Sequence, residues 1–503
     1  SFVPNVPLFS QSLEIPVLIN VTVDKTTQQA LLNWTFSNPA IINGYIIKRQ
    51  INGQGPAVVE GSYQTIETIN NPNQFSYLDG SIAFGPSLPA SGVETYRVVA
   101  FDATDLSNMS NPVSTIYLST VEFDLCQEQN RLIWTSYNGF GSNLSGYNVY
   151  YSNTLAGTPI LIAELGAVDT TFTHTNVAAN EQYYYYVEAL NSQNTLVSVS
   201  NIQQISTTMP PVPQIMNADY ASVEGYEQVD LSFTLDQNGV VNEYLLLKSD
   251  SLVGTYDTLS RFPSGIDKLT YSDFVKTNQV VAFYKVLAIN TCGLPGRESN
   301  VAHNIVLEAT TDNTNIYQNN LTWNPYEGWR GGVATYTIFR SVDGGAFEEI
   351  VQLNAGDLSY VDDVSQWVQP EYNGQASKGH FCYYIEAREG SANPYGIEGV
   401  SKSNISCAHQ ETVTYLPNAF NPMSQTEANR TFKPVISFVN DYQLIIYNRW
   451  GEIVFKSSDP LLGWDGKGND GNLLKKGTYV FYLKYRSANN KLIEKSGQIN
   501  LVY

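Results

Sequence analysis

The segment Tyr96-Arg97-Val98-Val99-Ala100 carries a pattern that the chain repeats three more times, with tyrosine, valine or isoleucine, and alanine at alternate positions. The other copies are Tyr185-Tyr-Val187-Glu-Ala189, Tyr284-Lys-Val286-Leu-Ala288 and Tyr383-Tyr-Ile385-Glu-Ala387, and successive tyrosines lie 89, 99 and 99 residues apart. Side chains at alternate positions of a β-strand point to one face. Each copy is therefore expected to be a strand whose tyrosine, aliphatic residue and alanine face a core.

Three further landmarks accompany each copy in the same order. An aromatic residue ends a short apolar strand at Trp34, Trp134, Phe233 and Trp323. A tyrosine opens another strand 11 or 13 residues later, at Tyr45, Tyr147, Tyr244 and Tyr336. A Ser-Asn pair closes each unit, with its asparagine at Asn111, Asn201, Asn300 and Asn404. Because 503 residues are too many for one hydrophobic core, this repeat indicates an array of similar domains.

The order of these landmarks resembles the fibronectin type III fold, a two-sheet sandwich with a central tryptophan and a tyrosine whose hydroxyl anchors a corner. The predicted fold class is all-β, a linear array of four fibronectin type III-like β-sandwiches followed by a C-terminal Ig-like β-sandwich. A count of 34 tyrosines with only 15% charged residues agrees with half-buried strands. The predicted boundaries are 1–11 for an N-terminal linker, 12–119, 120–209, 210–308 and 309–412 for the four sandwiches, and 413–503 for the last domain.

Residues 413–503 break the repeat and contain a different set of phrases. These are Leu416-Pro-Asn418-Ala-Phe420, Tyr447-Asn448-Arg449-Trp450-Gly451, Gly463-Trp464-Asp465-Gly466 and Gly477-Thr-Tyr479. A strand, a tight turn and a second strand are predicted from Leu444 to Phe455, with Gly451 supplying the positive φ that such a turn needs. Another hairpin is predicted around residues 488–490, joining Tyr479–Lys484 to Gly497–Tyr503.

These phrases closely resemble the gliding-motility-associated C-terminal domain, which is the type B sorting domain of the Bacteroidetes type IX secretion system. The resemblance implies a small sandwich that directs a folded protein from the periplasm to the cell surface and stays attached to it. As partners of residues 413–503 it implies the type IX translocon and an outer-membrane protein of the PorP/SprF class. The expected location is extracellular, on the cell surface and attached to the outer membrane.

The residues of these phrases are the candidate contacts for the secretion and anchoring partners: Asn418, Phe420, Tyr447, Asn448, Arg449, Trp450, Gly451, Gly463, Trp464, Asp465, Gly466, Gly477 and Tyr479. The turn at 448–451 is the best candidate among them, because arginine beside tryptophan is typical of a binding hot spot. In the alternative interpretation, both tryptophans pack across the sandwich, and Asp465-Gly466 only forms a turn.

Two of the four cysteines are predicted to form a disulfide. Cys382 and Cys407 lie at equal distances from the middle of a Gly-rich loop near residue 394, so a hairpin would place them opposite each other. In relatives with such repeats, cysteines are expected to link adjacent sandwiches. The corresponding partner positions of this chain hold other residues, Thr104 and Asn315. Cys126 and Cys292 are therefore predicted to be unpaired.

No metal, cofactor, nucleic acid or catalytic residue is predicted. The resembled family usually carries an acidic loop that could hold Ca²⁺, whereas residues 423–430 contain one carboxylate beside an arginine. A formal net charge of −20 disfavours nucleic-acid binding. The sequence has no Gly-x-Ser-x-Gly elbow, P-loop or dinucleotide fingerprint, and its histidines fall in separate segments, at His174, His303, His380 and His409.

The predicted function is the C-terminal stalk and type IX secretion and anchoring signal of a cell-surface adhesin linked to gliding motility. The chain does not begin with Met and is expected to be a mature form or a fragment, with an upstream region that binds a surface polysaccharide. In the alternative, the sandwiches are accessory or carbohydrate-binding modules of a secreted polysaccharide-degrading enzyme with the same sorting domain. Sugar binding needs exposed coplanar rings, for which the candidates are Tyr183 to Tyr186, Trp329 and Trp367.

Overall fold

The computed structural model describes residues 13–50, 62–193, 195–312, 314–315, 317–367, 377–487 and 490–503. The predicted linker at 1–11 lies outside these residues. The chain forms two compact units, residues 1–210 and 211–503. Within the described residues, helix is limited to short 3-10 turns at Pro39–Ile41, Gly141–Asn143, Ser365–Trp367 and Glu427–Asn429. The predicted all-β class is confirmed.

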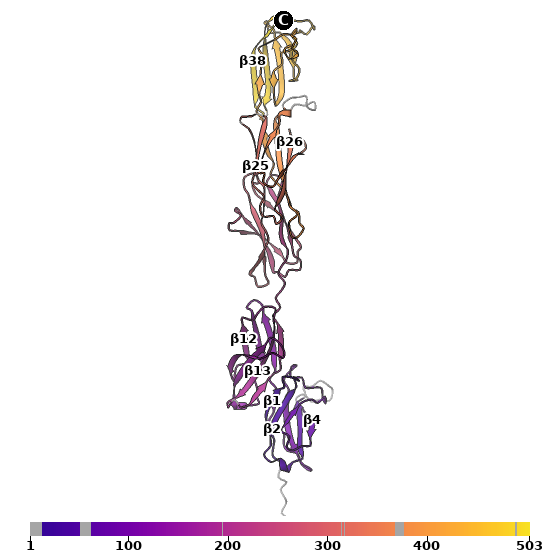
Figure 1. Cartoon of the computed structure of the whole chain (residues 1–503), viewed down its shortest axis with the longest axis vertical. Helices are drawn as coiled ribbons and strands as arrows, with labels where there is room; N and C mark the ends of the chain where they lie inside the picture. The colour runs from indigo at the N-terminus through magenta and orange to yellow at the C-terminus, as the bar shows by residue number, and fades with distance from the viewer. Residues whose placement is uncertain are drawn as a thin grey trace, which may run out of the picture. The chain divides into compact units, whose positions relative to one another are not determined.

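Unit 1 contains two sandwiches (Figure 1). In each of them, a three-stranded sheet faces a larger one. The first has the orders β1-β2-β5 and β4-β3-β6-β7, with bounds β1 Val17–Val23, β2 Ala30–Thr35, β3 Gly44–Gln50, β4 Tyr63–Ile69, β5 Ser76–Leu78, β6 Thr95–Phe101 and β7 Val113–Ser114. The second has the orders β12-β9-β8 and β11-β10-β13-β14, with β15 also on β13. Its bounds are β8 Leu118–Asp124, β9 Gln129–Trp134, β10 Leu144–Ser152, β11 Ile160–Gly166, β12 Thr171–Thr175, β13 Gln182–Asn191, β14 Val197–Val199 and β15 Gln203–Ser206.

Unit 2 repeats this strand order twice. The third sandwich has β16 Met216–Glu224, β17 Gln228–Leu235 and β20 Lys268–Phe274 facing β18 Glu243–Ser249, β19 Asp257–Pro263, β21 Phe283–Ile289, β22 Pro295–Glu298 and β23 Ala302–His303. The fourth has β24 Leu307–Thr311, β25 Gln318–Trp323 and β28 Ser359–Asp363 facing β26 Val333–Val342, β27 Glu348–Asn354, β29 His380–Glu389, β30 Val400–Lys402 and β31 Ser406–His409. This arrangement of strands is the fibronectin type III-like sandwich that the landmarks predicted.

The last part of unit 2 has a different topology. Its main sheet has the order β33-β38-β37-β35-β36, and β32 pairs with β34 beside it. The bounds are β32 Thr414–Tyr415, β33 Ala419–Phe420, β34 Val435–Ile436, β35 Val439–Tyr447, β36 Ile453–Ser457, β37 Gly477–Ser487 and β38 Leu492–Leu501. The β35–β36 and β37–β38 hairpins lie where the sequence predicted them, although residues 488 and 489 of the second turn lie outside the described part.

The Ser-Asn pair that ends each repeat ties its last strand to both sheets. In the first sandwich, Asn111 accepts the Leu18 N–H (3.1 Å) and donates to the Leu18 carbonyl (2.9 Å). The same two bonds join Asn201 to Leu118, Asn300 to Ala218 and Asn404 to Leu307. Each preceding serine accepts, at 2.9 Å, the N–H of the aliphatic residue in the tyrosine strand, namely Val98, Val187, Val286 or Ile385. Polar side chains thus replace ladder partners, since buried backbone groups need hydrogen bonds.

The tyrosine of each repeated strand is fully buried and links the two sheets of its sandwich. In the fourth sandwich, the Tyr383 hydroxyl donates to Asp362 (2.7 Å), which also pairs with Arg340 (2.8 Å). The first and third sandwiches have the same triad, at Tyr96-Asp79-Arg49 and Tyr284-Asp273-Lys248. The second uses neutral partners, with Tyr185 bonded to Asn130 and His174. The expected corner contact is therefore a bond between sheets.

Within each unit, the two fibronectin-like neighbours share one type of junction. In unit 1, the Val21 N–H donates to the Tyr137 hydroxyl (3.1 Å), and the Ser198 hydroxyl donates to the Val21 carbonyl (2.6 Å). In unit 2, Ala221 makes the same two bonds, to Tyr326 (3.1 Å) and from Ser401 (2.7 Å). In both junctions, side-chain hydroxyls of one sandwich form hydrogen bonds with the backbone of the first strand of its neighbour, β1 or β16.

Candidate binding site in the last domain

Residues from Phe420 to Leu501 form a hydrophobic core of their own. Trp464 is completely buried in it, 5.3 Å from the Phe420 ring and 4.8 Å from the Tyr479 ring between centroids. The Trp464 indole N–H donates to the Lys467 carbonyl (2.8 Å). One aromatic residue of this segment, Phe438, packs instead with the core of the fourth sandwich.

The turn between β35 and β36 is held by one asparagine. Asn448 Oδ1 accepts the N–H groups of Trp450 (2.9 Å) and Glu452 (3.1 Å), so the side chain closes the turn from within. Gly451 has φ of 82°, a conformation that favours glycine. This geometry leaves Trp450 77% exposed, with the Arg449 guanidinium carbon 5.3 Å from its ring centroid.

The predicted contact residues divide into surface and interior groups. On the surface lie Asn418, Arg449, Trp450, Gly451, Asp465 and Gly477, in the interior lie Phe420, Trp464, Gly466 and Tyr479, and Tyr447, Asn448 and Gly463 are half-buried. The Asp465 carboxylate accepts the Lys467 N–H (3.1 Å), which makes it a turn residue. Trp464 and Asp465 therefore have the structural roles of the alternative interpretation, a packed core residue and a turn residue. Trp450 does not pack across the sandwich, because it faces solvent.

Two of the predicted phrases meet at a groove of about 370 Å³. The turn residues Asn448, Arg449 and Trp450 form one wall, and the segment from Leu474 to Tyr479 forms the other. Val454, Leu474, Lys475, Lys476 and Thr478 also line the groove, and sequence reasoning missed these five. The two lysines adjoin the Gly477-Thr-Tyr479 phrase, so a search for basic residues beside that phrase would have found them.

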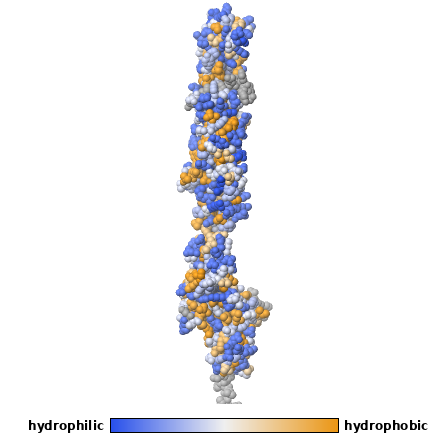
Figure 2. All heavy atoms as spheres, in the orientation of Figure 1, coloured by the Kyte–Doolittle hydropathy of each residue, from blue (hydrophilic) through white to orange (hydrophobic). Residues whose placement is uncertain are grey.

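The charge of this domain is opposite to that of the remaining chain. Residues 413–503 contain 11 Lys or Arg and 7 Asp or Glu, whereas residues 1–412 contain 16 and 40. On the face shown in Figure 2, hydrophilic residues cover most of the last domain, with small hydrophobic patches between them. The groove therefore combines basic side chains and aromatic rings on a domain with a net positive charge.

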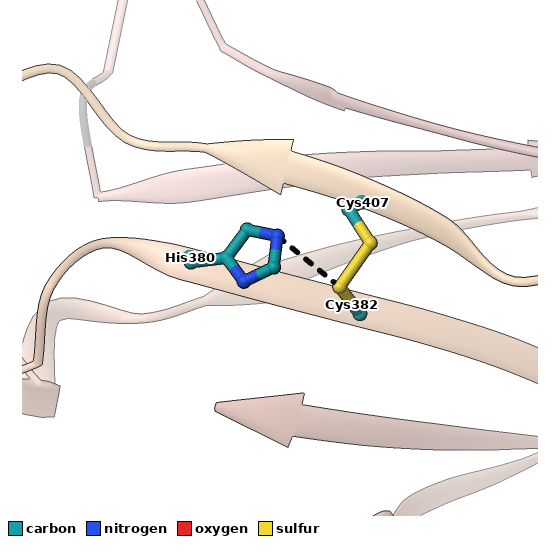
Figure 3. Close-up of side chains that lie close together, drawn as sticks. All are labelled: His380, Cys382 and Cys407. Atoms are coloured by element: carbon teal, nitrogen blue, oxygen red, sulfur yellow. Dashed lines mark hydrogen bonds between the residues drawn. A yellow bond between two sulfur atoms is a disulfide. The ribbon is translucent and has the colours of Figure 1, made fainter. Parts of the chain in front are cut away.

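The structure joins Cys382 and Cys407 in a disulfide with an S–S distance of 2.07 Å (Figure 3). The two residues lie opposite each other in the ladder between β29 and β31, the register that the sequence predicted. His380 Nε2 lies 3.4 Å from Cys382 Sγ. Because the thiolate is the metal-binding form of cysteine, this bonded pair beside a histidine is not a metal site. The absence of Ca²⁺ at 423–430 stays a prediction.

The prediction that Cys126 and Cys292 are unpaired is wrong, because both are disulfide-bonded. The sequence argument tested one equivalent position for each cysteine and found Thr104 and Asn315 there. Disulfide formation depends on Cα distances and Cβ directions in space. The position of a residue relative to the landmarks of its repeat gives neither this distance nor this direction.

Most of the aromatic rings predicted as candidates for sugar binding are buried. Trp329 is 6% exposed, packs on Tyr326 with 3.9 Å between centroids, and donates its indole N–H to the Asp219 carbonyl (2.7 Å). It therefore belongs to the junction between the third and fourth sandwiches. Among residues 183–186, only Tyr184 is not buried, and Trp367 is half-buried.

A sandwich array that ends in a small, basic, separately packed domain is the class of protein that these features define. Residues 414–501 match the family model described as the CHU_C type IX secretion signal domain. The chain therefore carries a type IX secretion signal, as its motifs predicted. It is an exported protein of the cell surface or extracellular space, and it interacts with the secretion machinery.

Two solved structures resemble the chain at low similarity. Chicken CNTN1 domains FN1–FN3 are 13% identical with a TM-score of 0.22, covering 59% of this chain and 97% of that one. A tetra-tandem repeat in the extending region of a large adhesion protein is 14% identical with a TM-score of 0.22, covering 77% and 98%. No curated protein matches the chain. In the described part of the chain, no helix has the length and apolar character to cross a bilayer.

Proposed function

We propose that this chain is the stalk and the secretion and anchoring segment of a cell-surface adhesin that works in gliding motility. The observation that carries the proposal is the type IX signal domain at 414–501, with its exposed Arg449-Trp450 turn, joined to fibronectin-like sandwiches. The sandwiches act as a spacer between the cell surface and the upstream region, and the last domain acts as the secretion signal. Its partners are the translocon and an outer-membrane protein of the PorP/SprF class, which keeps the chain on the outer membrane. A region upstream binds the surface polysaccharide.

The proposal includes no enzyme activity, because the buried carboxylates at two of the tyrosine links have structural partners. The carboxylate of Asp362 is bonded to both Tyr383 and Arg340, and Asp79 is bonded to both Tyr96 and Arg49. Each carboxylate ties a buried tyrosine to a cation of the same sandwich, which is a structural role. The burial of Trp329, Tyr183, Tyr185 and Tyr186 likewise disfavours carbohydrate-binding modules, because Tyr184 alone does not form a row of exposed rings.

The test is to fuse residues 413–503 to a folded fluorescent protein and express the fusion in a type IX-competent host and in a translocon-deficient strain. The expected result is fluorescence that added protease removes from intact competent cells, because the domain carries its cargo to the surface and holds it there. The matched control is the same fusion with Trp464→Ala, which removes the core tryptophan and should abolish export. Retention of the unmodified fusion in the periplasm of competent cells would contradict the proposal.

The proposed role in adhesion and gliding needs a separate measurement. Cells that produce the full protein without residues 211–412 should still display its upstream region, yet attach and glide less well because that region is held closer to the membrane. Unchanged attachment and gliding would remove the role of the sandwiches as a stalk. Surface display, measured with an antibody, is the control for export.

A further inference from the structure

We propose that the groove between the 448–451 turn and the 474–479 segment binds an acidic stretch of polypeptide belonging to the secretion and anchoring machinery. This inference rests on the proposed function and names the chemistry of the partner. Of the contacts predicted from the sequence, those at the groove are the turn residues, Gly477 and Tyr479, and the structure adds Lys475 and Lys476 beside them. Two apolar side chains complete the groove, Val454 and Leu474.

Among the described residues of the chain, the basic side chains of the groove have no salt-bridge partner. Arg449, Lys475 and Lys476 line it, and none of them makes a salt bridge within the described residues of the chain. By contrast, three other cations of the domain pair with carboxylates: Lys467 with Asp465, Lys484 with Glu494 and Arg486 with Asp441. Clustered like charges repel one another, so an anionic ligand would relieve the repulsion in the groove.

The nearest carboxylate along the turn is already engaged. Glu452 accepts a hydrogen bond from Asn448 Nδ2 (2.7 Å) and does not line the groove. Arg449 lies against the Trp450 ring, and Lys476 Nζ lies 4.8 Å from the Tyr503 ring centroid. Cation–π contacts of this kind hold a charged group at a surface without neutralising it. The positive charge therefore remains available to a ligand.

The shape and the rings favour a peptide over a small anion. The groove holds about 370 Å³ and combines the cations with the exposed Trp450, the Tyr479 ring and the aliphatic Val454. Interfaces place Trp, Tyr and Arg at their energetic centre, and a carboxylate gains from arginine in particular because the guanidinium bonds it in two places. An acidic segment with an apolar residue would use both the charges and the rings.

The first test uses purified full-length chain and a fluorescein-labelled octapeptide in which glutamate alternates with phenylalanine, followed by fluorescence anisotropy. The expected result is saturable binding that weakens at least about tenfold when Arg449, Lys475 and Lys476 are changed to Gln, because close charge pairs dominate such sites. A matched variant changes three paired cations of the same domain to Gln: Lys467, Lys484 and Arg486. It should bind as the unmodified chain does.

Three outcomes would overturn the inference: equal weakening in both triple variants, equal binding of a peptide with lysine in place of glutamate, or full displacement by millimolar inorganic phosphate. Trp450→Ala is a further variant that keeps the charges, and it should also weaken binding, since the ring is exposed. Unchanged affinity in Trp450→Ala would exclude the peptide mode of binding.

The second test separates this inference from the proposed function. The fluorescent fusion of residues 413–503 is expressed with the groove triple variant and, separately, with the matched triple variant. Loss of surface fluorescence in the groove variant alone supports the inference. Normal export of the groove variant overturns it and leaves the sorting function intact, whereas failure of the unmodified fusion counts against the proposed function itself.

Discussion

Replacing the buried tyrosine with phenylalanine is predicted to lower the free energy of local opening by different amounts in the fourth and the second sandwich. Tyr383→Phe removes a hydroxyl that donates to the Asp362 carboxylate and accepts from Asn319 Nδ2 (both 2.7 Å). Burial and the nearby Asp362 raise the pKa of Tyr383, so the hydroxyl keeps its proton and remains a donor at neutral pH. Tyr185→Phe removes two neutral contacts, to Asn130 and His174 (both 2.8 Å).

The magnitudes follow from the type of bond that is lost. A bond to a charged group contributes about 1.5–3 kcal/mol, and a neutral bond contributes about 0.5–1.5 kcal/mol. Tyr383→Phe should therefore lower the free energy of local opening by about 3 kcal/mol, and Tyr185→Phe by about 2 kcal/mol. The difference of about 1 kcal/mol corresponds to roughly a fivefold difference in the open population.

Amide hydrogen exchange in the full-length chain is the suitable assay, because a chain with several domains has no single unfolding transition. Exchange of peptides that cover β29 and β13 reports the opening of the fourth and second sandwiches separately. Tyr384→Phe is the control, since this half-buried neighbour stacks on Phe339 (4.6 Å) outside the triad. A loss for Tyr185→Phe as large as that for Tyr383→Phe would refute the role of the carboxylate.

Three further predictions follow from the core, the disulfide and a buried histidine. Replacing Cys382 and Cys407, which are 25 residues apart, with Ala should destabilise the fourth sandwich by about 3 kcal/mol through loop entropy, and faster exchange in that sandwich would show it. Trp464→Ala should cost about 3–5 kcal/mol in the last domain, whereas Trp450→Ala should cost less than about 0.5 kcal/mol; similar losses by urea-dependent exchange would contradict their different burial. Burial lowers the pKa of His303, whose neutral ring accepts the Glu327 N–H (2.6 Å), so its stabilising contribution is present above pH of about 6.5 and is lost as the pH falls below that value. Exchange near His303 that does not change between pH 7 and pH 5, after correction for the intrinsic rate, would contradict this.

The sequence predicts the local elements that recur along the chain. It does not predict the contacts that the fold forms between segments far apart in the sequence. The tyrosine strands, the Ser-Asn pairs and the hairpin at Gly451 follow from residue type and period. The Tyr383–Asp362 bond joins strands of opposite sheets, and no spacing rule gives the pairing of two sheets. Similarly, the sequence places Lys475 beside the Gly477-Thr-Tyr479 phrase, and only the fold brings that phrase next to the Arg449 turn.

The junctions within each unit show why some contacts leave little trace in a sequence. β1 and β16 are edge strands of their three-stranded sheets, so their outer N–H and C=O groups lack ladder partners. An open edge invites pairing with other chains, and the hydroxyls of the neighbouring sandwich satisfy Val21 and Ala221 on that side. Since the contact uses backbone atoms of the edge strand, its side chain can change from valine to alanine without loss of either bond. Only the hydroxyl-bearing residues of the neighbour are constrained, and in sequence they look like an ordinary loop tyrosine and an ordinary serine of a short strand.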